Sequence, residues 1–135
     1  MSSEIQIKVR GYHIDHFGHV NNGKYCDFFE EGRWGYFDDK PELIDYFHTN
    51  DLVHVVAGIL IRYKRPLVVG DLLTLETEVL KARRSGFTML QVIHQTDTDI
   101  IAATAEVQNV LVNGANGKIV PIPSELAGLW PDLGI

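Results

Sequence analysis

The sequence predicts an α+β fold in which a curved antiparallel sheet wraps around one long central helix. Three observations lead to this fold class. One strand-like segment precedes a long apolar helix, four strand-like segments follow it, and short turns join these strands. Strands joined in this way favour an antiparallel meander, which has one face to bury. The long helix is the largest apolar element available to cover that face.

The first half of the chain holds the first strand and the helices. Residues 5–9 alternate apolar and polar side chains, as strands do. The long helix is expected from about Asn22 to Phe37, with a broad apolar stripe that predicts burial of most of it. Gly32 on that stripe indicates either close approach to another element or a merely tolerated glycine. Residues 41–48 predict a shorter helix with Pro41 in its first turn. The residues of the stripe are Tyr25, Phe29, Gly32 and Tyr36, broadened by Cys26, Phe28, Arg33 and Phe37.

The second half of the chain reads as strands. A run rich in β-branched residues comes first, and three segments with alternating polarity follow, separated by turn-forming residues. A last short helix is expected to open at residues 123–125 and to end near Trp130. The expected strands are 53–63, 72–81, 87–95 and 100–112, with turns at 84–86, 97–99 and 113–118.

Composition narrows the class of protein. The chain has 135 residues, 45% of them hydrophobic and 22% charged, which predicts a single globular domain over residues 1–135. The net charge of −6 argues against a nucleic-acid binder. No apolar run is long enough for a membrane span, and the first residues do not read as a signal peptide. Cys26 is the single cysteine, so no disulfide is expected and a reducing cytoplasm is the expected location.

The segment 12–22 is the strongest candidate for a functional site. It places Asp15 and three imidazoles directly before the expected helix, and Asn21 and Asn22 are good residues to cap that helix. A helix start offers unpaired backbone N–H groups and a partial positive charge. An acid next to such a start can attack a carbonyl carbon or activate water while the N–H groups polarise the carbonyl. The pattern therefore predicts an acyl-transfer site.

Two sequence blocks resemble the hotdog-fold acyl-CoA thioesterases of the 4-hydroxybenzoyl-CoA thioesterase class. The first reads Asp15-His16-Phe17-Gly18-His19-Val20-Asn21-Asn22, with Tyr25 after it and then Glu31-Gly32-Arg33. The second reads Tyr63-Lys64-Arg65-Pro66, followed by Gly70-Asp71. The amino-acid sequences of residues 8–13 and 30–34 are especially similar to the bacterial long-chain acyl-CoA thioesterase branch. Many relatives carry Asp-Thr-Asp where this chain has His13-Ile14-Asp15, so only the second acid is present.

The resemblance implies a role for each matching residue. Asp15 is the expected nucleophile or general base, and the sequence does not choose between these routes. His19 is expected to orient Asp15 or its loop, or to take part in the chemistry. Glu31 occupies a position on the helix where other hotdog enzymes carry their acid, so it is a second candidate carboxylate. The expected carbonyl-polarising backbone lies at Gly18, Val20, Asn21 and Asn22, and Tyr25 is expected in the core with a hydroxyl that can reach the site.

Basic residues and histidines raise two further questions. In this family setting the bunched basic residues are candidate contacts for the phosphates of coenzyme A, although exposed strand ends often carry such residues for solubility. A metal site built from His13, His16 and His19 is disfavoured, because spacings of three in an extended segment place side chains on opposite faces. No metal and no cofactor are therefore expected. The basic candidates are Arg62, Lys64, Arg65, Arg83 and Arg84.

The leading prediction is hydrolysis of medium-to-long-chain fatty acyl-CoA to free fatty acid and coenzyme A. Alternatives are an aryl-CoA thioesterase of the hydroxybenzoyl type, a hotdog hydratase or dehydratase, and a non-catalytic acyl-binding module. The aromatic residues of the helix could line a tunnel for a fatty chain or simply fill the core. The resemblance also implies a homodimer or homotetramer with sites at the subunit interface.

Overall fold

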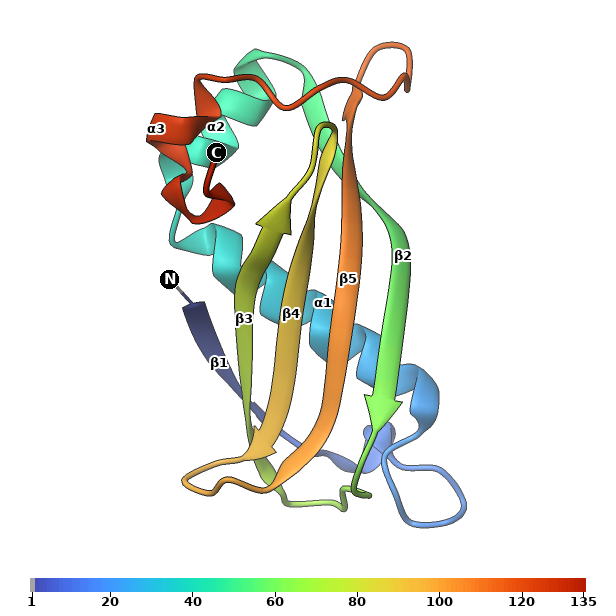
Figure 1. The fold of residues 1–135 in the computed structure, drawn as a ribbon. Coiled ribbons are helices and arrows are strands. Elements are labelled where there is room, and N and C mark those ends of the chain that lie inside the picture. Colours follow the sequence, from blue (N-terminus) through green and yellow to red (C-terminus); the bar gives the residue numbers. More distant parts are fainter. Residues whose placement is uncertain (1) are drawn as a thin grey trace.

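The computed structural model describes residues 2–135. In this part of the chain, five strands form one antiparallel sheet in the order β1-β3-β4-β5-β2, and helix α1 crosses one face of it (Figure 1). The predicted fold class is therefore confirmed. The strands are β1 (Ser2–Lys8), β2 (Leu52–Tyr63), β3 (Leu72–Ala82), β4 (Gly86–Gln95) and β5 (Ile101–Asn113). The helices are α1 (Asn22–Asp38), α2 (Pro41–Thr49) and α3 (Leu126–Leu129), with single 3₁₀ turns η1 (Gly11–His13) and η2 (Pro131–Leu133).

The expected four-strand meander is right for β3, β4 and β5 and wrong for β2. Strand β2 pairs with β5 at the far edge of the sheet, and β1 takes the place beside β3. The physical reason lies in the connection 64–71. Eight residues reach up to about 26 Å, whereas crossing three strand spacings takes about 14 Å. Two strands that are consecutive in the sequence must therefore be neighbours in the sheet only where their connection is too short to cross other strands.

Helix α1 buries one stripe against the sheet, as its spacing predicts. Phe29 and Tyr36 are fully buried in the same cluster as Leu75 and Met89 of the sheet. Gly32 is a site of close approach, because a Cβ there would overlap the Leu75 side chain. The helix is less buried than expected on its flanks.

Cys26 and Trp34 show this incomplete burial. Cys26 is exposed and Trp34 keeps 60% of its surface accessible. The sheet covers α1 from one side only, so side chains that point along the β2 edge remain in solvent.

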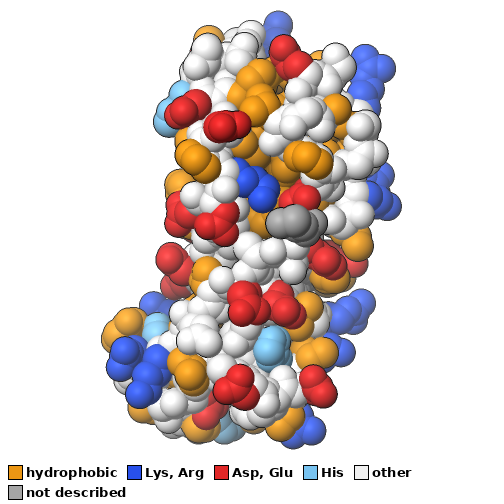
Figure 2. Space-filling model, turned by 90° about the vertical axis from the view of Figure 1, so that its left-hand side faces the viewer, with side chains coloured by type: hydrophobic (Ala, Val, Ile, Leu, Met, Phe, Trp, Pro, Cys, Tyr) orange, Lys and Arg blue, Asp and Glu red, His pale blue; other side chains and the backbone are white. Residues whose placement is uncertain are grey.

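The two edges of the sheet differ in character. Figure 2 shows the side of the molecule that carries the β1 edge, where acidic side chains gather. Strand β2 at the other edge carries exposed apolar residues instead, among them Val55, Val56 and Leu60. Among residues 2–135, no helix has the length and apolar character that a membrane span requires.

Candidate active site

The loop between β1 and α1 is held in place by a buried histidine. His13 Nδ1 accepts a hydrogen bond from the Arg10 backbone N–H at 2.8 Å, and its ring packs edge-on against Phe28 at 4.9 Å. Burial, together with the charges of Lys24 and Arg10, lowers the pKa of His13. The side chain is therefore a neutral anchor of the loop. His16 and His19 are exposed, and no cluster of three metal-binding side chains occurs in residues 2–135.

Asp15 sits in a tight turn that fixes its carboxylate. Its carbonyl oxygen accepts from the Gly18 N–H at 3.0 Å, and Oδ1 accepts from the Phe17 N–H at 2.9 Å. Gly18 has φ +80°, a conformation that glycine adopts without strain. The Asp15 N–H donates to the His19 carbonyl at 3.0 Å. Within the described residues, Oδ2 of Asp15 has no hydrogen-bond partner and is left available to a ligand.

The start of helix α1 supplies one backbone donor that is similarly available. Asn21 is the N-cap, and its side chain accepts from the Gly23 N–H at 2.9 Å. The N–H groups of Gly18, Val20 and Asn21 donate to backbone carbonyl oxygens. The Asn22 N–H, at the first helical position, donates to no group in residues 2–135. Of the four positions expected to polarise a carbonyl, Asn22 is the one with a backbone donor still unused.

The two sequence blocks of the predicted motif meet at this helix start. The Val20 N–H donates to the Leu67 carbonyl at 2.9 Å, which ties the Asp15 loop to the connection after β2. The Tyr63 hydroxyl donates to the Asn22 carbonyl at 3.3 Å, and the Tyr25 and Tyr63 rings lie 5.0 Å apart. Residues about forty positions apart in the chain thus form one site.

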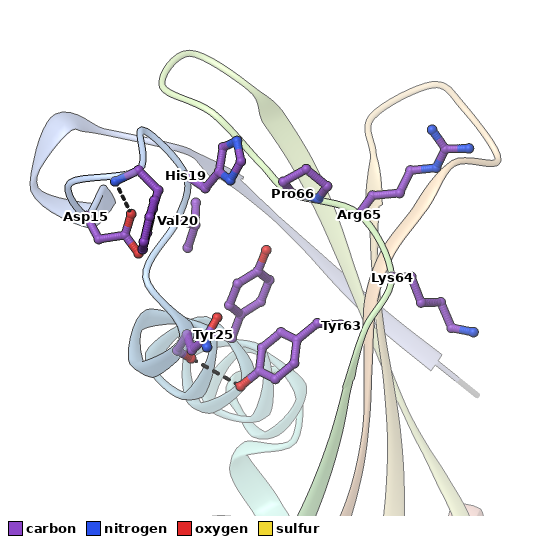
Figure 3. A pocket seen from close by; sticks show the side chains of 10 residues that line it. Asp15, His19, Val20, Tyr25, Tyr63, Lys64, Arg65 and Pro66 are labelled. Carbon is purple, nitrogen blue, oxygen red and sulfur yellow. Dashed lines mark hydrogen bonds between the residues drawn. The ribbon is translucent and has the colours of Figure 1, made fainter.

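A cavity of about 380 Å³ lies between these segments (Figure 3). The Tyr25 and Tyr63 rings lie below His19 and Pro66, and Lys64 and Arg65 extend away from Asp15 toward the outer rim. Burial, reinforced by Tyr63, raises the pKa of Tyr25 to about 12, so its hydroxyl stays protonated and can donate. The lining residues are Asp15, Phe17, His19, Val20, Asn22, Tyr25, Tyr63, Lys64, Arg65 and Pro66.

Several predicted site residues lie elsewhere in the chain. Glu31 is exposed on α1 and does not line the cavity, and neither does Arg62. Arg83 and Arg84 occupy the β3–β4 turn, at the opposite end of the sheet from the Asp15 loop (Figure 1). Their separation follows from strand direction, because β2 and β3 end at opposite ends of the sheet. Within one chain, the basic residues Lys64 and Arg65 after β2 therefore lie far from Arg83 and Arg84.

Three lining residues were not among the predicted site residues: Phe17, Tyr63 and Pro66. Tyr63 and Pro66 belong to the second sequence block, so the signal was present. The position of β2 in the sheet could not be predicted from the sequence. The end of β2 meets the start of α1 because β2 lies at the sheet edge beyond β5. His19 lines the cavity, and no hydrogen bond joins its side chain to the Asp15 carboxylate in the described part of the chain.

The fold and this site together define a class of enzyme. An antiparallel sheet around a central helix, with an acid-bearing turn at the helix start, is what the sequence resemblance predicts for hotdog thioester hydrolases. A family model described as the thioesterase-like superfamily matches residues 9–129. The chain belongs to this superfamily and is a thioester hydrolase.

Individual relatives agree with this assignment. The long-chain acyl-CoA thioesterase FadM of Escherichia coli (strain K12) is 32% identical over 123 residues, which cover 91% of this chain and 92% of the relative. The crystal structure of YbaW, a probable thioesterase from Escherichia coli, superposes with a TM-score of 0.86 at 32% identity, covering 96% of this chain and 97% of that chain. Slr0204, a 1,4-dihydroxy-2-naphthoyl-CoA thioesterase from Synechocystis, shares the fold with a TM-score of 0.83 at 18% identity, covering 100% and 99% of the two chains.

Proposed function

We propose that this enzyme hydrolyses medium-to-long-chain fatty acyl-CoA to a free fatty acid and coenzyme A. The observation that carries the proposal is that the Asp15 carboxylate and the helix-start residue Asn22 line one cavity, each with a polar group that has no partner in residues 2–135. The FadM relative is named for long-chain acyl-CoA. This likeness favours a fatty acyl substrate over an aryl one.

The proposed reaction uses the two unpaired groups on the same thioester. The carbonyl oxygen accepts a hydrogen bond from the Asn22 N–H, at the positive end of the helix dipole. Asp15 either attacks the carbonyl carbon, giving a mixed anhydride that water then hydrolyses, or removes a proton from the attacking water. In both routes the tetrahedral oxyanion faces the helix start, and the coenzyme A sulfur leaves as thiolate and takes up a proton.

Tyr25 and His19 are proposed to support this chemistry. The protonated Tyr25 hydroxyl lines the cavity and can donate to the substrate. His19 lines the same cavity from an exposed position and is proposed to donate a proton to the leaving thiolate. Glu31 has no proposed catalytic role within its own chain, because it is exposed outside the cavity.

Coenzyme A is proposed to lie across the basic rim of the cavity. Lys64 and Arg65 are exposed at the end of β2 and form no ion pair within residues 2–135, so both are available to phosphate groups. Arg83 and Arg84 can reach the same coenzyme A only from a second subunit. The acyl chain is proposed to run over the surface between α1 and β2 and not through the core. Of the six helix aromatics that could line a tunnel, five are buried and only Trp34 is exposed. The five buried ones are Tyr25, Phe28, Phe29, Tyr36 and Phe37.

A second copy of the chain is the proposed partner along β2. This edge strand is twelve residues long, apolar, and unpaired on its outer side in the described chain. Such an edge is a template for pairing, whereas the acidic β1 edge disfavours a like-charged neighbour. Light scattering should therefore give a dimer or tetramer, and a mass near the monomer value of 15.2 kDa would contradict this proposal.

Thiol release from a panel of thioesters tests the proposed function. Acetyl-, octanoyl-, palmitoyl- and benzoyl-CoA should differ in kcat/KM, with the fatty chains of eight or more carbons preferred, because each buried methylene contributes about 0.8 kcal/mol. A benzoyl preference would favour the aryl-CoA alternative. No thiol release from any member would leave the binding module or the hydratase as the better interpretation.

A further inference from the structure

A second pocket of about 270 Å³ lies between α1, α2 and strand β2, farther along α1 than the active-site cavity. Its walls are apolar and come from Trp34, Phe37, Ile44 and Val56. Polar side chains also face it, and three of them carry hydrogen-bonding groups that nothing in the described chain satisfies. An apolar pocket with a few convergent polar groups is the usual form of a ligand site.

Arg33 is the charged group of this pocket. Its Nη1 donates to Gln91 Oε1 at 3.0 Å, and no carboxylate in residues 2–135 lies within ion-pair distance of the guanidinium. Burial lowers the pKa of Arg33, which the nearby Glu30 partly offsets. Glu30 itself is exposed, and its Oε2 accepts from Trp34 Nε1 at 3.4 Å. A partly buried cation with no carboxylate in ion-pair contact is costly to the fold and is suited to receive an anion.

Two neutral groups lie beside this cation. The His54 ring stacks on Phe37 at 4.6 Å, and neither of its nitrogens has a hydrogen-bond partner among residues 2–135. Burial and the charge of Arg33 lower its pKa, so the ring is neutral and offers one N–H. Asn109 is buried and donates from Nδ2 to the Val107 carbonyl at 3.3 Å, which leaves its second N–H unused. Together with Arg33, these residues can donate several hydrogen bonds to one carboxylate.

Both pockets lie between α1 and β2, since Tyr25 and Tyr63 line the active-site cavity whereas Arg33 and Val56 line this one. Between the two pockets, Cys26 lies one helical turn beyond Asn22 and is exposed. On β2, Tyr63, Ile59 and Val56 keep exposed apolar surface on the face toward α1.

The distance along α1 between the two pockets sets a length for the acyl chain. From Asn22 to Arg33 the helix rises about 16 Å. An extended alkyl chain advances about 1.3 Å per bond for a bond length of about 1.5 Å. The thioester carbonyl and the pocket are thus separated by about twelve carbons.

We propose that this pocket binds a carboxylate at the far end of the acyl chain. The substrate class would then be coenzyme A mono-thioesters of dicarboxylic acids with about twelve carbons. This inference rests on the proposed function, since it names the substrate of the same site. Arg33 pairs with the terminal carboxylate, His54 and Asn109 donate to it, and the apolar walls hold the last methylenes.

A matched pair of substrates tests the inference. Lauroyl-CoA and the mono-CoA thioester of dodecanedioic acid differ only at the chain end. The wild-type enzyme should prefer the dicarboxylic thioester by about tenfold or more in kcat/KM, the effect of charge-assisted hydrogen bonds. Arg33→Met should abolish this preference mainly by slowing the dicarboxylic substrate. Arg33→Lys, which keeps the charge, should restore part of it, and Lys118→Met at an exposed turn should leave the preference unchanged.

A second readout guards against a variant that fails to fold. His54→Phe preserves the aromatic stack and should weaken inhibition by free dodecanedioic acid while leaving inhibition by lauric acid unchanged. Equal kcat/KM for the two thioesters, or a preference that survives Arg33→Met, would overturn the inference and leave the thioesterase proposal standing. If the wild-type enzyme released no thiol from octanoyl-CoA, that result would instead contradict the proposed function itself.

Discussion

The two ends of helix α1 carry polar clusters that differ in how completely their hydrogen-bonding groups are used. At the C-terminal end, the Tyr36 hydroxyl donates to Asp132 Oδ2 at 2.6 Å and accepts from Trp130 Nε1 at 2.8 Å. Lys40 Nζ lies 3.6 Å from the same Asp132 oxygen and 4.3 Å from the Tyr36 ring centre. Every polar group named here has a partner, and Tyr36 and Trp130 are fully buried.

At the N-terminal end, the cavity shows the opposite pattern. Asp15 Oδ2 and the Asn22 N–H have no partner in residues 2–135, although the turn and the helix cap around them are closed by hydrogen bonds. Paired polar groups in the core hold a fold together, whereas unpaired groups that line an open cavity are available to bind a ligand. The difference supports the proposal that the N-terminal cluster performs the reaction, whereas the C-terminal one stabilises the protein.

Removing the charge at Asp15 should have the largest effect on activity. Asp15→Asn keeps the size of the side chain but removes both the nucleophile and the base, so kcat should fall at least about a hundredfold, or about 2.7 kcal/mol. The free energy of unfolding should change little. Asp27→Asn, at an exposed carboxylate on the same helix, is the control and should retain full activity. An Asp15→Asn enzyme with more than about a third of wild-type turnover would contradict the assignment.

Removing one hydroxyl from the C-terminal cluster should affect stability instead. Tyr36→Phe leaves the buried Trp130 N–H without an acceptor and takes a donor from Asp132, so the free energy of unfolding should drop by about 1–3 kcal/mol. Urea unfolding measures this drop, and thiol release under native conditions should match wild type. A fall in kcat without a fall in stability would reverse the roles given to the two clusters.

A smaller effect is expected on the pH dependence of stability. Burial alone would raise the pKa of Asp132, but the hydrogen bond from Tyr36 and the charge of Lys40 hold it below its ordinary value. A depressed carboxyl pKa stabilises the fold above the unfolded value of 3.8 and loses this contribution as pH falls through the folded pKa. The stability difference between wild type and Asp132→Asn should therefore shrink between pH 6 and pH 3. A difference that stays constant over this range would show that Asp132 contributes no charge-dependent stability.

The sequence predicted local structure better than long-range arrangement. Alternation and helical spacing located the strands and both main helices, because each pattern depends on a few neighbouring residues. The place of β2 depends on how the connection 64–71 crosses the sheet, which no local pattern encodes. For the same reason the sequence could not distinguish Arg65 from Arg84. Both are basic residues near strand ends, but they lie at opposite ends of the sheet.

Much of the site followed from the sequence because one segment carries most of it. Asp15, Asn22 and Tyr25 lie within eleven residues, so the turn and the helix start fix their geometry. Which backbone N–H remains available could not be predicted, because the Val20 N–H is used by Leu67 from a distant connection. The pocket around Arg33 and His54 was missed for the same reason, since it needs α1, α2 and β2 together.

Replacing Asn22 by proline tests whether the Asn22 N–H acts on the same carbonyl as Asp15. Proline is favoured at the first helical position and removes the N–H, and Asn21 already has the extended backbone, with φ −63° and ψ 140°, that precedes proline. The matched control, Asn22→Ala, keeps the N–H. We expect Asn22→Pro to fold normally and to lose about 2.7–4 kcal/mol of transition-state stabilisation in kcat, with Asn22→Ala near wild type. Equal kcat of the two variants would show that the Asn22 N–H does not stabilise the transition state.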